Sequence, residues 1–284
     1  MSSMLGKNKF IEKAIKNAFE EDIGDGDHSS LACIPMAAES KAKLIAKDYG
    51  VLAGVEIAEF VFSIYGDFLF KKKIEDGAKI KPGDIAFEVE GNTQGILACE
   101  RLVLNIMQRM SGISTKTSLM LELIKGCSTK ILDTRKTTPN FRVFEKEAVR
   151  IWGGMNHRFA LYDMIMLKDN HIDYAGGVKK ALLKTNEYLK RIGQTIKVEI
   201  EVRDFKELKE ALECGLFNRV MLDNFTPEQV RKALVLIGGR YETEASGGIT
   251  ESNLRDYAET GIDFISVGAL THHVNSLDLS LKAF

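Results

Sequence analysis

The sequence is poor in cysteine and has no long apolar run. Its 284 residues include four cysteines, which are far apart and form no CxxC pair: Cys33, Cys99, Cys127 and Cys214. This spacing indicates neither a zinc site nor a disulfide framework, so we expect ordinary thiols. No apolar segment approaches the roughly 20 residues that a membrane-spanning helix needs. We therefore expect no membrane association.

An excess of charge is also missing. The chain has 39 Lys and Arg against 40 Asp and Glu, a formal charge of −1. Nucleic-acid binding normally needs an extended basic surface, so we expect no nucleic-acid partner and only a local basic site. Residues 1–22 lack the apolar core of a signal peptide and carry acids too early for a transit peptide, which predicts a cytoplasmic protein.

The hydrophobic pattern predicts a small α/β unit followed by alternating strands and helices. The first part has helical segments at 10–20 and 55–64 and strand-like segments at 41–47 and 85–89. A long helix is expected at 96–123, with a break at Ser111–Gly112. The short apolar strands beyond it predict a parallel sheet or barrel. These strands are 130–132, 164–167, 197–202, 219–222, 241–245 and 264–267.

Polar and glycine residues follow the later strands. The C-terminal ends of parallel strands meet at one edge of an α/β barrel, so these residues should meet in space. For Asn224 or Gly247 alone, a cap or a turn would be sufficient explanation. Their recurrence favours a site. The residues concerned are Asp133–Lys136, Lys168–Asn170, Glu201, Asp223–Asn224, Ser246–Gly248 and Gly268.

Several cations lie beside short apolar runs or glycines, where a chain can leave the core and face a ligand. They are Arg135, Lys136, His157, Arg158 and Lys168. Arginine grips a carboxylate or phosphate bidentately and lysine adds a compact charge, so the group suits a doubly charged anion. A different set, Arg142, Lys146 and Arg150, has helical spacing beside acids and is expected to form a solvated helix face.

Carboxylates and a glycine loop complete the predicted site. Glu199 and Glu201 share one face of a strand; Glu201 with Asp223 suggests a Mg²⁺ and sugar-hydroxyl site, whereas Glu199 is expected to form a structural salt bridge with a lysine. The loop 246–248 precedes a helical segment and could receive a phosphate, with 268–271 completing the cradle. No nucleophile motif is present. The set suits a phosphorylated sugar and an acidic co-substrate.

Motifs throughout the chain resemble the quinolinate phosphoribosyltransferase family, also called nicotinate-nucleotide pyrophosphorylase (carboxylating). They are GDGDHSS, GVLAG, ERLVLNIMQRMSGIST, LDTRKTTP, GGMNHRFALYDMIMLKDNH, VEIEV, MLDNF, ASGGI and ISVGALTH. The resemblance implies that quinolinate and 5-phosphoribosyl-1-pyrophosphate become nicotinate mononucleotide, pyrophosphate and CO₂ in de novo NAD biosynthesis. It also implies an N-terminal α/β sandwich, 1–115 with the tail 272–284, an open, incomplete α/β barrel, 116–271, and a homodimer with shared active sites, with a hexamer left open.

The resemblance also implies roles for individual residues. Quinolinate would be held by Arg101 of the neighbouring subunit and by Arg135, His157, Arg158 and Lys168. The phosphates would face Lys136, Lys168, Ser246, Gly247, Gly248, Gly268 and His272. Glu201 and Asp223 would serve the ribose hydroxyls and Mg²⁺. Two positions depart from the family pattern: Trp152 replaces a common glycine, and His273 a common small residue.

Two other functions are compatible with the same scaffold. One is a relative of this family linked to molybdenum transport, against which the joint presence of Arg101, Arg135, His157, Arg158 and Lys168 argues. The other is a non-catalytic phosphate- or nucleotide-binding barrel. A pure anion binder has no use for Glu201 and Asp223, so these carboxylates discriminate between the two classes.

Overall fold

The computed structural model describes residues 9–284, and the chain divides into two compact units. The first contains residues up to Leu119 together with Lys136–Gly153 and Leu270–Phe284; the second contains Met120–Arg135 and Gly154–Ala269. The domain limits expected from the sequence stay a prediction, and their first eight residues lie outside the described part of the chain. Each unit is described by itself.

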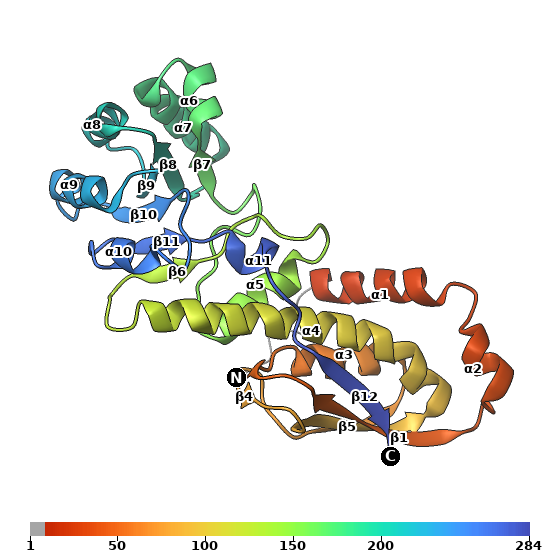
Figure 1. Ribbon diagram of the computed structural model, residues 1–284. Coiled ribbons are helices and arrows are strands. Elements are labelled where there is room, and N and C mark those ends of the chain that lie inside the picture. Colours follow the sequence, from red (N-terminus) through yellow and green to blue (C-terminus); the bar gives the residue numbers. More distant parts are fainter. Residues whose placement is uncertain (1–8) are drawn as a thin grey trace. The chain divides into compact units, whose positions relative to one another are not determined.

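The first unit is built on a four-stranded antiparallel sheet with the order β12-β1-β5-β3. These strands are β1 (Glu39–Ala46), β3 (Phe68–Lys72), β5 (Ile85–Asn92) and β12 (Leu279–Ala283). Strand β12 pairs with β1 from Ala42↔Ala283 to Ala46↔Leu279 (Figure 1). The end of the chain thus completes a sheet made by its beginning. A two-stranded ribbon, β2 (Gly50–Val51) with β4 (Lys79–Ile80), belongs to the same unit.

The helices of this unit match the apolar periodicity of the sequence. They are α1 (Lys9–Ile23), α2 (His28–Cys33), α3 (Val55–Tyr65), most of α4 (Thr93–Leu123), α5 (Arg142–Ile151) and most of α11 (Ala269–His272). The predicted helices at 10–20 and 55–64 and strands at 41–47 and 85–89 are confirmed. Phe62 of α3 packs on Phe68 and Phe87 from the sheet, with ring centroids 5.2 and 6.2 Å away, which fastens helix to sheet.

Two sequence interpretations in this unit were wrong. Helix α4 runs without a break through Ser111–Gly112. The Ser111 hydroxyl accepts the Ala53 N–H at 2.9 Å, and a Cβ atom at Gly112 would overlap the backbone oxygen of Asn275, so the pair permits close packing. Lys146 was expected on a solvated helix face but is only 3% exposed. It lies among the buried residues of α5.

The second unit is built on a six-stranded parallel sheet with the order β6-β11-β10-β9-β8-β7. The strands are β6 (Lys130–Leu132), β7 (Ile165–Leu167), β8 (Val198–Val202), β9 (Arg219–Asp223), β10 (Glu242–Ser246) and β11 (Phe264–Ser266). Every strand predicted from a short apolar segment is therefore present. The sheet ends at β6 on one side and β7 on the other, and the α/β class is confirmed.

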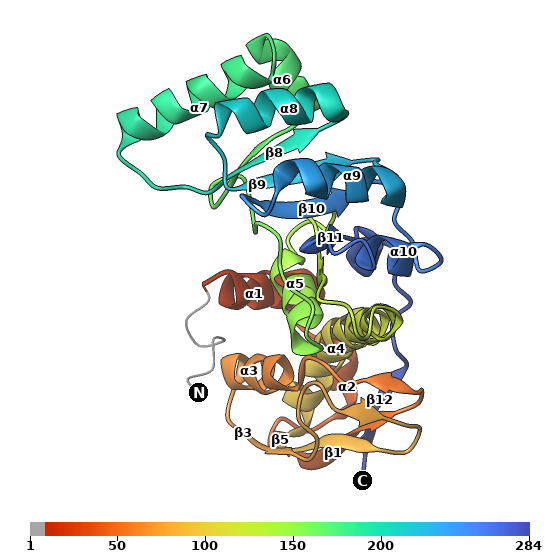
Figure 2. The ribbon, with the colours of Figure 1, turned by 90° about the vertical axis from the view of Figure 1, so that its left-hand side faces the viewer.

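Helices alternate with these strands: α6 (Asp169–Ala175), α7 (Val178–Ile192), α8 (Phe205–Cys214), α9 (Pro227–Ile237) and α10 (Leu254–Ala258). Helices α7, α8 and α9 lie along one side of β8–β10 (Figure 2). Their starts follow capping chemistry: the Asp204 carboxylate accepts two backbone N–H groups of α8, and Thr226 forms a capping box with Gln229 at α9.

Strand register determines which side chains meet. Parallel pairing aligns Glu242 with Arg219 and Ser246 with Asp223, so alternate residues of β9 and β10 share a face. All five residues of β8 are buried, including Glu199 and Glu201. Within residues 9–284, no helix is both long and apolar enough to span a membrane.

Candidate active site

Asp133 joins the end of β6 to the segment that carries the NHR motif. Its carboxylate is fully buried and accepts the backbone N–H of His157 at 2.9 Å, while its second oxygen accepts the amide group of Asn156. Both contacts lie within the second unit. Two motifs more than 20 residues apart in sequence are thereby held together.

Arg135 and Arg158, one from each motif, are electrostatic neighbours. Burial lowers the pKa of Arg158 and the like charge of Arg135 lowers it further. The Arg158 guanidinium donates to the Met164 carbonyl at 3.1 Å, and the Asp163 carboxylate accepts the backbone N–H groups of Phe159 and Ala160. The Arg158 guanidinium, beside a turn held by Asp163, and the neighbouring Arg135 guanidinium can receive carboxylates.

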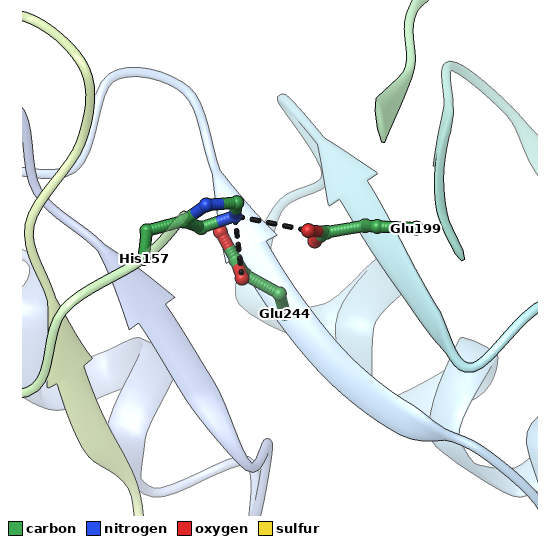
Figure 3. A group of neighbouring side chains, drawn as sticks. All are labelled: His157, Glu199 and Glu244. Carbon is green, nitrogen blue, oxygen red and sulfur yellow. Dashed lines mark ion pairs between the residues drawn. The ribbon is translucent and has the colours of Figure 1, made fainter. Parts of the chain in front are cut away.

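The His157 ring lies between Arg158 and two acidic strands. Its Nδ1 accepts the Arg158 backbone N–H at 2.7 Å, while its Nε2 is 2.9 Å from Glu199 Oε2 and 3.5 Å from Glu244 Oε2 (Figure 3). His157 is 8% exposed. Both ring nitrogens therefore face protein groups, and the direct contact with quinolinate expected for His157 stays a prediction.

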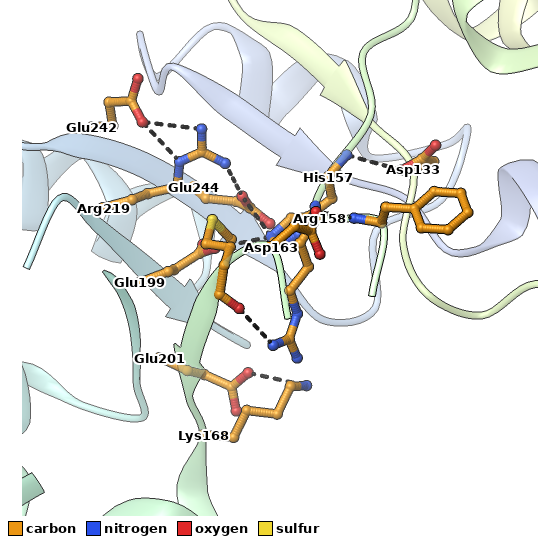
Figure 4. Close-up of polar contacts among 12 residues, drawn as sticks. Asp133, His157, Arg158, Asp163, Lys168, Glu199, Glu201, Arg219, Glu242 and Glu244 are labelled. Atoms are coloured by element: carbon orange, nitrogen blue, oxygen red, sulfur yellow. Dashed lines mark hydrogen bonds and ion pairs between the residues drawn. The ribbon is translucent and has the colours of Figure 1, made fainter. Parts of the chain in front are cut away.

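Arg219 supplies the positive charge beside these acids. Its guanidinium lies 3.0 Å from a Glu244 oxygen on one side and 3.0 Å from a Glu242 oxygen on the other (Figure 4). Burial raises the pKa of Glu199 to about 7 and that of Glu244 to about 8, with the repulsion from Glu199 adding to the shift of Glu244. The lysine partner expected for Glu199 was wrong: its ion-pair partner is His157.

Lys168, Glu201 and Asp223 lie at or just beyond the C-terminal ends of β7, β8 and β9. Lys168 Nζ is 3.5 Å from a Glu201 oxygen (Figure 4). Burial raises the pKa of Glu201, and the nearby charge of Asp223 raises it further, although Lys168 opposes both effects. Asp223 in turn accepts the Ser246 hydroxyl at 3.0 Å and the Asn224 amide at 2.7 Å. The sequence-predicted carboxylates are therefore neighbours.

The glycine loop after β10 has a conformation that few other residues adopt. Gly247 and Gly248 have φ values of 93° and 61°, and a Cβ atom at Gly247 would overlap the Asn224 side chain. The helix expected after this loop is short, Leu254–Ala258, because Asn253 and Thr250 form a turn before it. Gly268 lies two residues after the end of β11 and directly before α11.

The remaining predicted residues lie in the first unit. Arg101 is exposed on α4. The Lys136 carbonyl accepts the Thr271 hydroxyl at 2.8 Å. Burial lowers the pKa of His272, and the charges of His273 and Lys136 lower it further. Lys136 of the LDTRKTTP motif and His272 of the ISVGALTH motif are therefore neighbours inside this unit.

Of the two departures from the family pattern, Trp152 ends α5, where the Lys79 ammonium lies 5.7 Å from its ring centroid. The other departure is His273, whose carbonyl accepts Lys116 Nζ at 2.7 Å. Both residues thus have contacts within the first unit.

The comparisons with known proteins cover nearly the whole chain. The quinolinate phosphoribosyl transferase N-terminal domain matches residues 27–111 and the C-terminal domain of the same name matches residues 113–282. The chain belongs to the quinolinate phosphoribosyltransferase family. It is 42% identical over 288 residues to quinolinate phosphoribosyltransferase [decarboxylating] 1b of Nicotiana tabacum, covering 96% of this chain and 82% of the relative.

Bacterial relatives agree with this assignment. The probable nicotinate-nucleotide pyrophosphorylase [carboxylating] of Bacillus subtilis (strain 168) is 40% identical over 275 residues, covering 95% of this chain and 92% of the relative. The solved structure of the nicotinate-nucleotide pyrophosphorylase from Francisella tularensis is 36% identical, with a TM-score of 0.88. The match covers 97% of this chain and 96% of that chain. Sequence and fold therefore place the chain in one family of phosphoribosyltransferases.

Sequence reasoning missed residues that support the family motifs. Glu145 is fully buried, accepts the Thr138 N–H at 3.1 Å and pairs with Arg109 at 2.9 Å, which fixes the loop after Lys136. Arg219 and Glu244 were missed as well. Their signal was charge at alternate positions in otherwise buried strands, as in Glu242–Ser246, because such charges need partners.

Two groups of side chains have the donor types of a metal site. Glu201 and Asp223 offer hard oxygen ligands, and a cation would relieve the repulsion by Asp223 that adds to the raised pKa of Glu201. These residues fit Mg²⁺. His157, Glu199 and Glu244 also have ligand atoms within 4.8 Å of one another. There, however, a guanidinium already faces one carboxylate.

Proposed function

We propose that this chain transfers the phosphoribosyl group of 5-phosphoribosyl-1-pyrophosphate to quinolinate, with loss of CO₂, to form nicotinate mononucleotide for de novo NAD biosynthesis. One observation carries the proposal. The second unit holds a neighbouring pair of guanidinium groups, Arg135 and Arg158, and a neighbouring pair of carboxylates, Glu201 and Asp223. The first pair suits a dianion, and the second suits a sugar with its metal.

The quinolinate clamp consists of Arg135, Arg158 and Lys168, with His157 beside them. Each quinolinate carboxylate would accept charge-assisted hydrogen bonds, and the two arginines would form bidentate pairs. The lowered pKa of Arg158 supports this role, because a dianion would relieve the repulsion between the arginines. We assign Arg101 to the active site of a second subunit.

The phosphoribosyl group is assigned to the carboxylates and the glycine loops. Glu201 and Asp223 would accept hydrogen bonds from the ribose hydroxyls and hold Mg²⁺, directly or through water. Backbone N–H groups at Gly247, Gly248 and Gly268, with the Ser246 hydroxyl, would face phosphate oxygens. Lys136 and His272 would add charge and hydrogen bonds to the phosphates.

The chemistry needs no protein nucleophile. The quinolinate ring nitrogen forms a bond to the anomeric carbon as that carbon's bond to pyrophosphate breaks and the leaving group takes the electron pair. Lys168 and Lys136 would neutralise its charge, and Glu201 or Asp223 would favour the cationic sugar. When bound, Mg²⁺ would add positive charge at the leaving oxygens. These residues thus act mainly by position and charge.

Decarboxylation follows from the product of the first step. The ring nitrogen is then a pyridinium, which stabilises the electron pair left at the adjacent carbon when the C–CO₂ bond breaks. That carbon takes a proton from the medium to give nicotinate mononucleotide. The arginine pair would hold the other carboxylate throughout, so that the ring stays in place.

We also propose a homodimer, as the assignment of Arg101 to a second subunit requires, and we leave open whether dimers associate further. A cytoplasmic location is proposed too. All four cysteines are free thiols, which suits a reducing compartment.

A steady-state assay with quinolinate, 5-phosphoribosyl-1-pyrophosphate and Mg²⁺ tests the proposed function. We expect nicotinate mononucleotide to form only when both substrates are present. Arg158→Ala is the site control, because it should lower quinolinate use while the circular dichroism spectrum stays unchanged. If wild-type protein formed no product, the assignment would be wrong.

A further inference from the structure

We propose that Glu199 and Glu244, together with Arg219, are positioning residues that act through His157 on the Arg135–Arg158 pair. The inference rests on the proposed function, since it concerns how the quinolinate clamp is held. The assigned clamp contains neither the two glutamates nor Arg219. All of them lie in the second unit, on β8, β9 and β10.

An unbroken series of contacts runs from the sheet to Arg158. Arg219 is 3.0 Å from Glu244, and Glu244 and Glu199 both approach His157 Nε2 (Figures 3 and 4). His157 Nδ1 then accepts the Arg158 N–H at 2.7 Å. The position at which the Arg158 side chain leaves the backbone therefore depends on the His157 ring, and the ring depends on the glutamates.

A second contact links the His157 backbone to the loop that carries Arg135. The backbone N–H of His157 donates to Asp133, which is buried two residues before Arg135. The two arginines are thus fixed relative to each other through one residue, His157. Displacement of its ring would disturb the spacing that two quinolinate carboxylates require.

The hydrogen-bond pattern determines the protonation of the ring. Because Nδ1 accepts a backbone N–H, it carries no hydrogen, so a neutral ring carries its hydrogen on Nε2. The Nε2 atom lies 2.9 Å from Oε2 of the fully buried Glu199, although within residues 9–284 neither atom has a hydrogen bond with aligned geometry. Loss of this oxygen would remove a polar group that faces the buried Nε2, and the ring would turn away.

A metal ion held by His157, Glu199 and Glu244 fits the pattern less well. Nitrogen Nε2 would have to lose its hydrogen to bind a metal, and Nδ1 would then need the hydrogen that its contact with the Arg158 N–H excludes. The guanidinium beside Glu244 would also repel a cation. The tautomer and the nearby guanidinium favour a polar support of the ring over a metal site.

Charge and position predict opposite results when Glu199 is replaced. Removal of a negative charge near Arg158 should tighten dianion binding if the glutamate only tunes the potential. Removal of the acceptor for His157 should weaken binding if the glutamate positions the clamp. The direction of the change in quinolinate affinity therefore distinguishes the two roles.

The experiment compares three variants of the full-length protein. Glu199→Leu removes the acceptor at similar volume, Glu199→Gln keeps an acceptor oxygen, and Glu242→Gln is the matched control. Glu242 contacts Arg219, as Glu244 does, but its side chain is 42% exposed. Among the described residues, no contact links Glu242 to His157. Quinolinate affinity is measured by calorimetry, and KM is measured for both substrates.

We expect Glu199→Leu to weaken quinolinate binding about 10-fold or more, as loss of a buried polar contact predicts. The KM for 5-phosphoribosyl-1-pyrophosphate should change by less than about 2-fold, whereas a merely structural lesion would lower kcat through the folded fraction and leave both KM values alone. Glu199→Gln and Glu242→Gln should stay within about 3-fold of wild type. Equal or tighter quinolinate binding by Glu199→Leu would overturn the proposal.

A double mutant tests whether Glu199 acts through Arg158. In an Arg158→Ala background, Glu199→Leu should add little further loss, because the positioned side chain is already gone. Fully additive losses would contradict the proposal. If Glu199→Leu does not fold, Glu199→Asp takes its place in both tests. The aspartate carboxylate ends one carbon short of His157, so the same weakening of quinolinate binding is expected. Wild-type quinolinate affinity in Glu199→Asp would also overturn the proposal.

Nitrogen NMR of the wild-type protein checks the ring directly. His157, assigned by comparison with His157→Gln, should show a protonated Nε2 and an unprotonated Nδ1; the opposite tautomer would contradict the proposed support. Failure of the proposed function looks different, because wild-type protein would then bind no quinolinate. Normal binding by wild type and Glu199→Leu together would remove only the positioning role.

Discussion

The backbone N–H of Arg158 donates to Nδ1 of His157 at 2.7 Å. A residue assigned to a substrate carboxylate is thereby tied to a ring whose other nitrogen faces two buried acids. Adjacent residues of the NHR motif thus have different tasks: one presents charge to the ligand and the other fixes the direction of that charge.

Replacement of either clamp arginine should weaken quinolinate binding while the fold survives. For Arg135→Ala and Arg158→Ala, the loss of charge-assisted hydrogen bonds should cost roughly 1.5 to 3 kcal/mol, or about 10-fold to 150-fold in affinity. Lysine should rescue only in part, because it lacks the planar fork. Calorimetry with quinolinate measures the effect. Near-normal affinity in an alanine variant would remove that arginine from the clamp.

The carboxylate pair should behave differently. Glu201→Gln and Asp223→Asn should still bind quinolinate but turn over slowly. Each variant lacks a negative charge that would stabilise the cationic sugar and hold Mg²⁺. Turnover is measured across a Mg²⁺ titration, with chelation by EDTA as the metal-free reference. If both variants reached wild-type rates at every Mg²⁺ concentration, their roles would be structural.

The shared active site predicts complementation between two inactive subunits. An Arg101→Ala chain mixed with an Arg135→Ala chain should give heterodimers with one doubly altered site and one intact site. Activity should therefore reappear on mixing. Native mass spectrometry confirms subunit exchange; exchange without recovered activity would show that Arg101 does not serve a neighbouring subunit.

Gly112→Ala should destabilise the protein, although alanine is normally the better helix former by about 1 kcal/mol. A Cβ atom at this position would overlap the Asn275 backbone oxygen, which cannot move without shifting the chain that leads to β12. Thermal unfolding should show a lower Tm than wild type. Ser118→Ala on the same helix is the control and should unfold near the wild-type temperature; an unchanged Tm for Gly112→Ala would refute the packing argument.

The sequence predicted the strands of the second unit because each short apolar segment is bounded by polar or glycine residues. It also predicted that Glu201 and Asp223 would be neighbours, since both end parallel strands. The partner of Glu199 was not predictable in the same way. Its ion pair depends on a segment more than 40 residues away in sequence, and strand register cannot be derived from composition.

Gly112 shows the complementary difficulty. A glycine after a serine inside a helical pattern predicts a break, because glycine lowers helix propensity. In the structure, the missing side chain instead makes room for another part of the chain. Local propensity contains no information about such an approach, which comes from tertiary packing alone.

The most direct test of the proposed reaction follows the carboxylate that should leave. Quinolinate labelled with ¹³C in the carboxylate next to the ring nitrogen is incubated with 5-phosphoribosyl-1-pyrophosphate, Mg²⁺ and the protein. We predict that labelled CO₂, pyrophosphate and nicotinate mononucleotide form in equal amounts and that the nucleotide contains no label. Absence of the nucleotide, or retention of the label in it, would contradict the assignment of this chain as a decarboxylating quinolinate phosphoribosyltransferase.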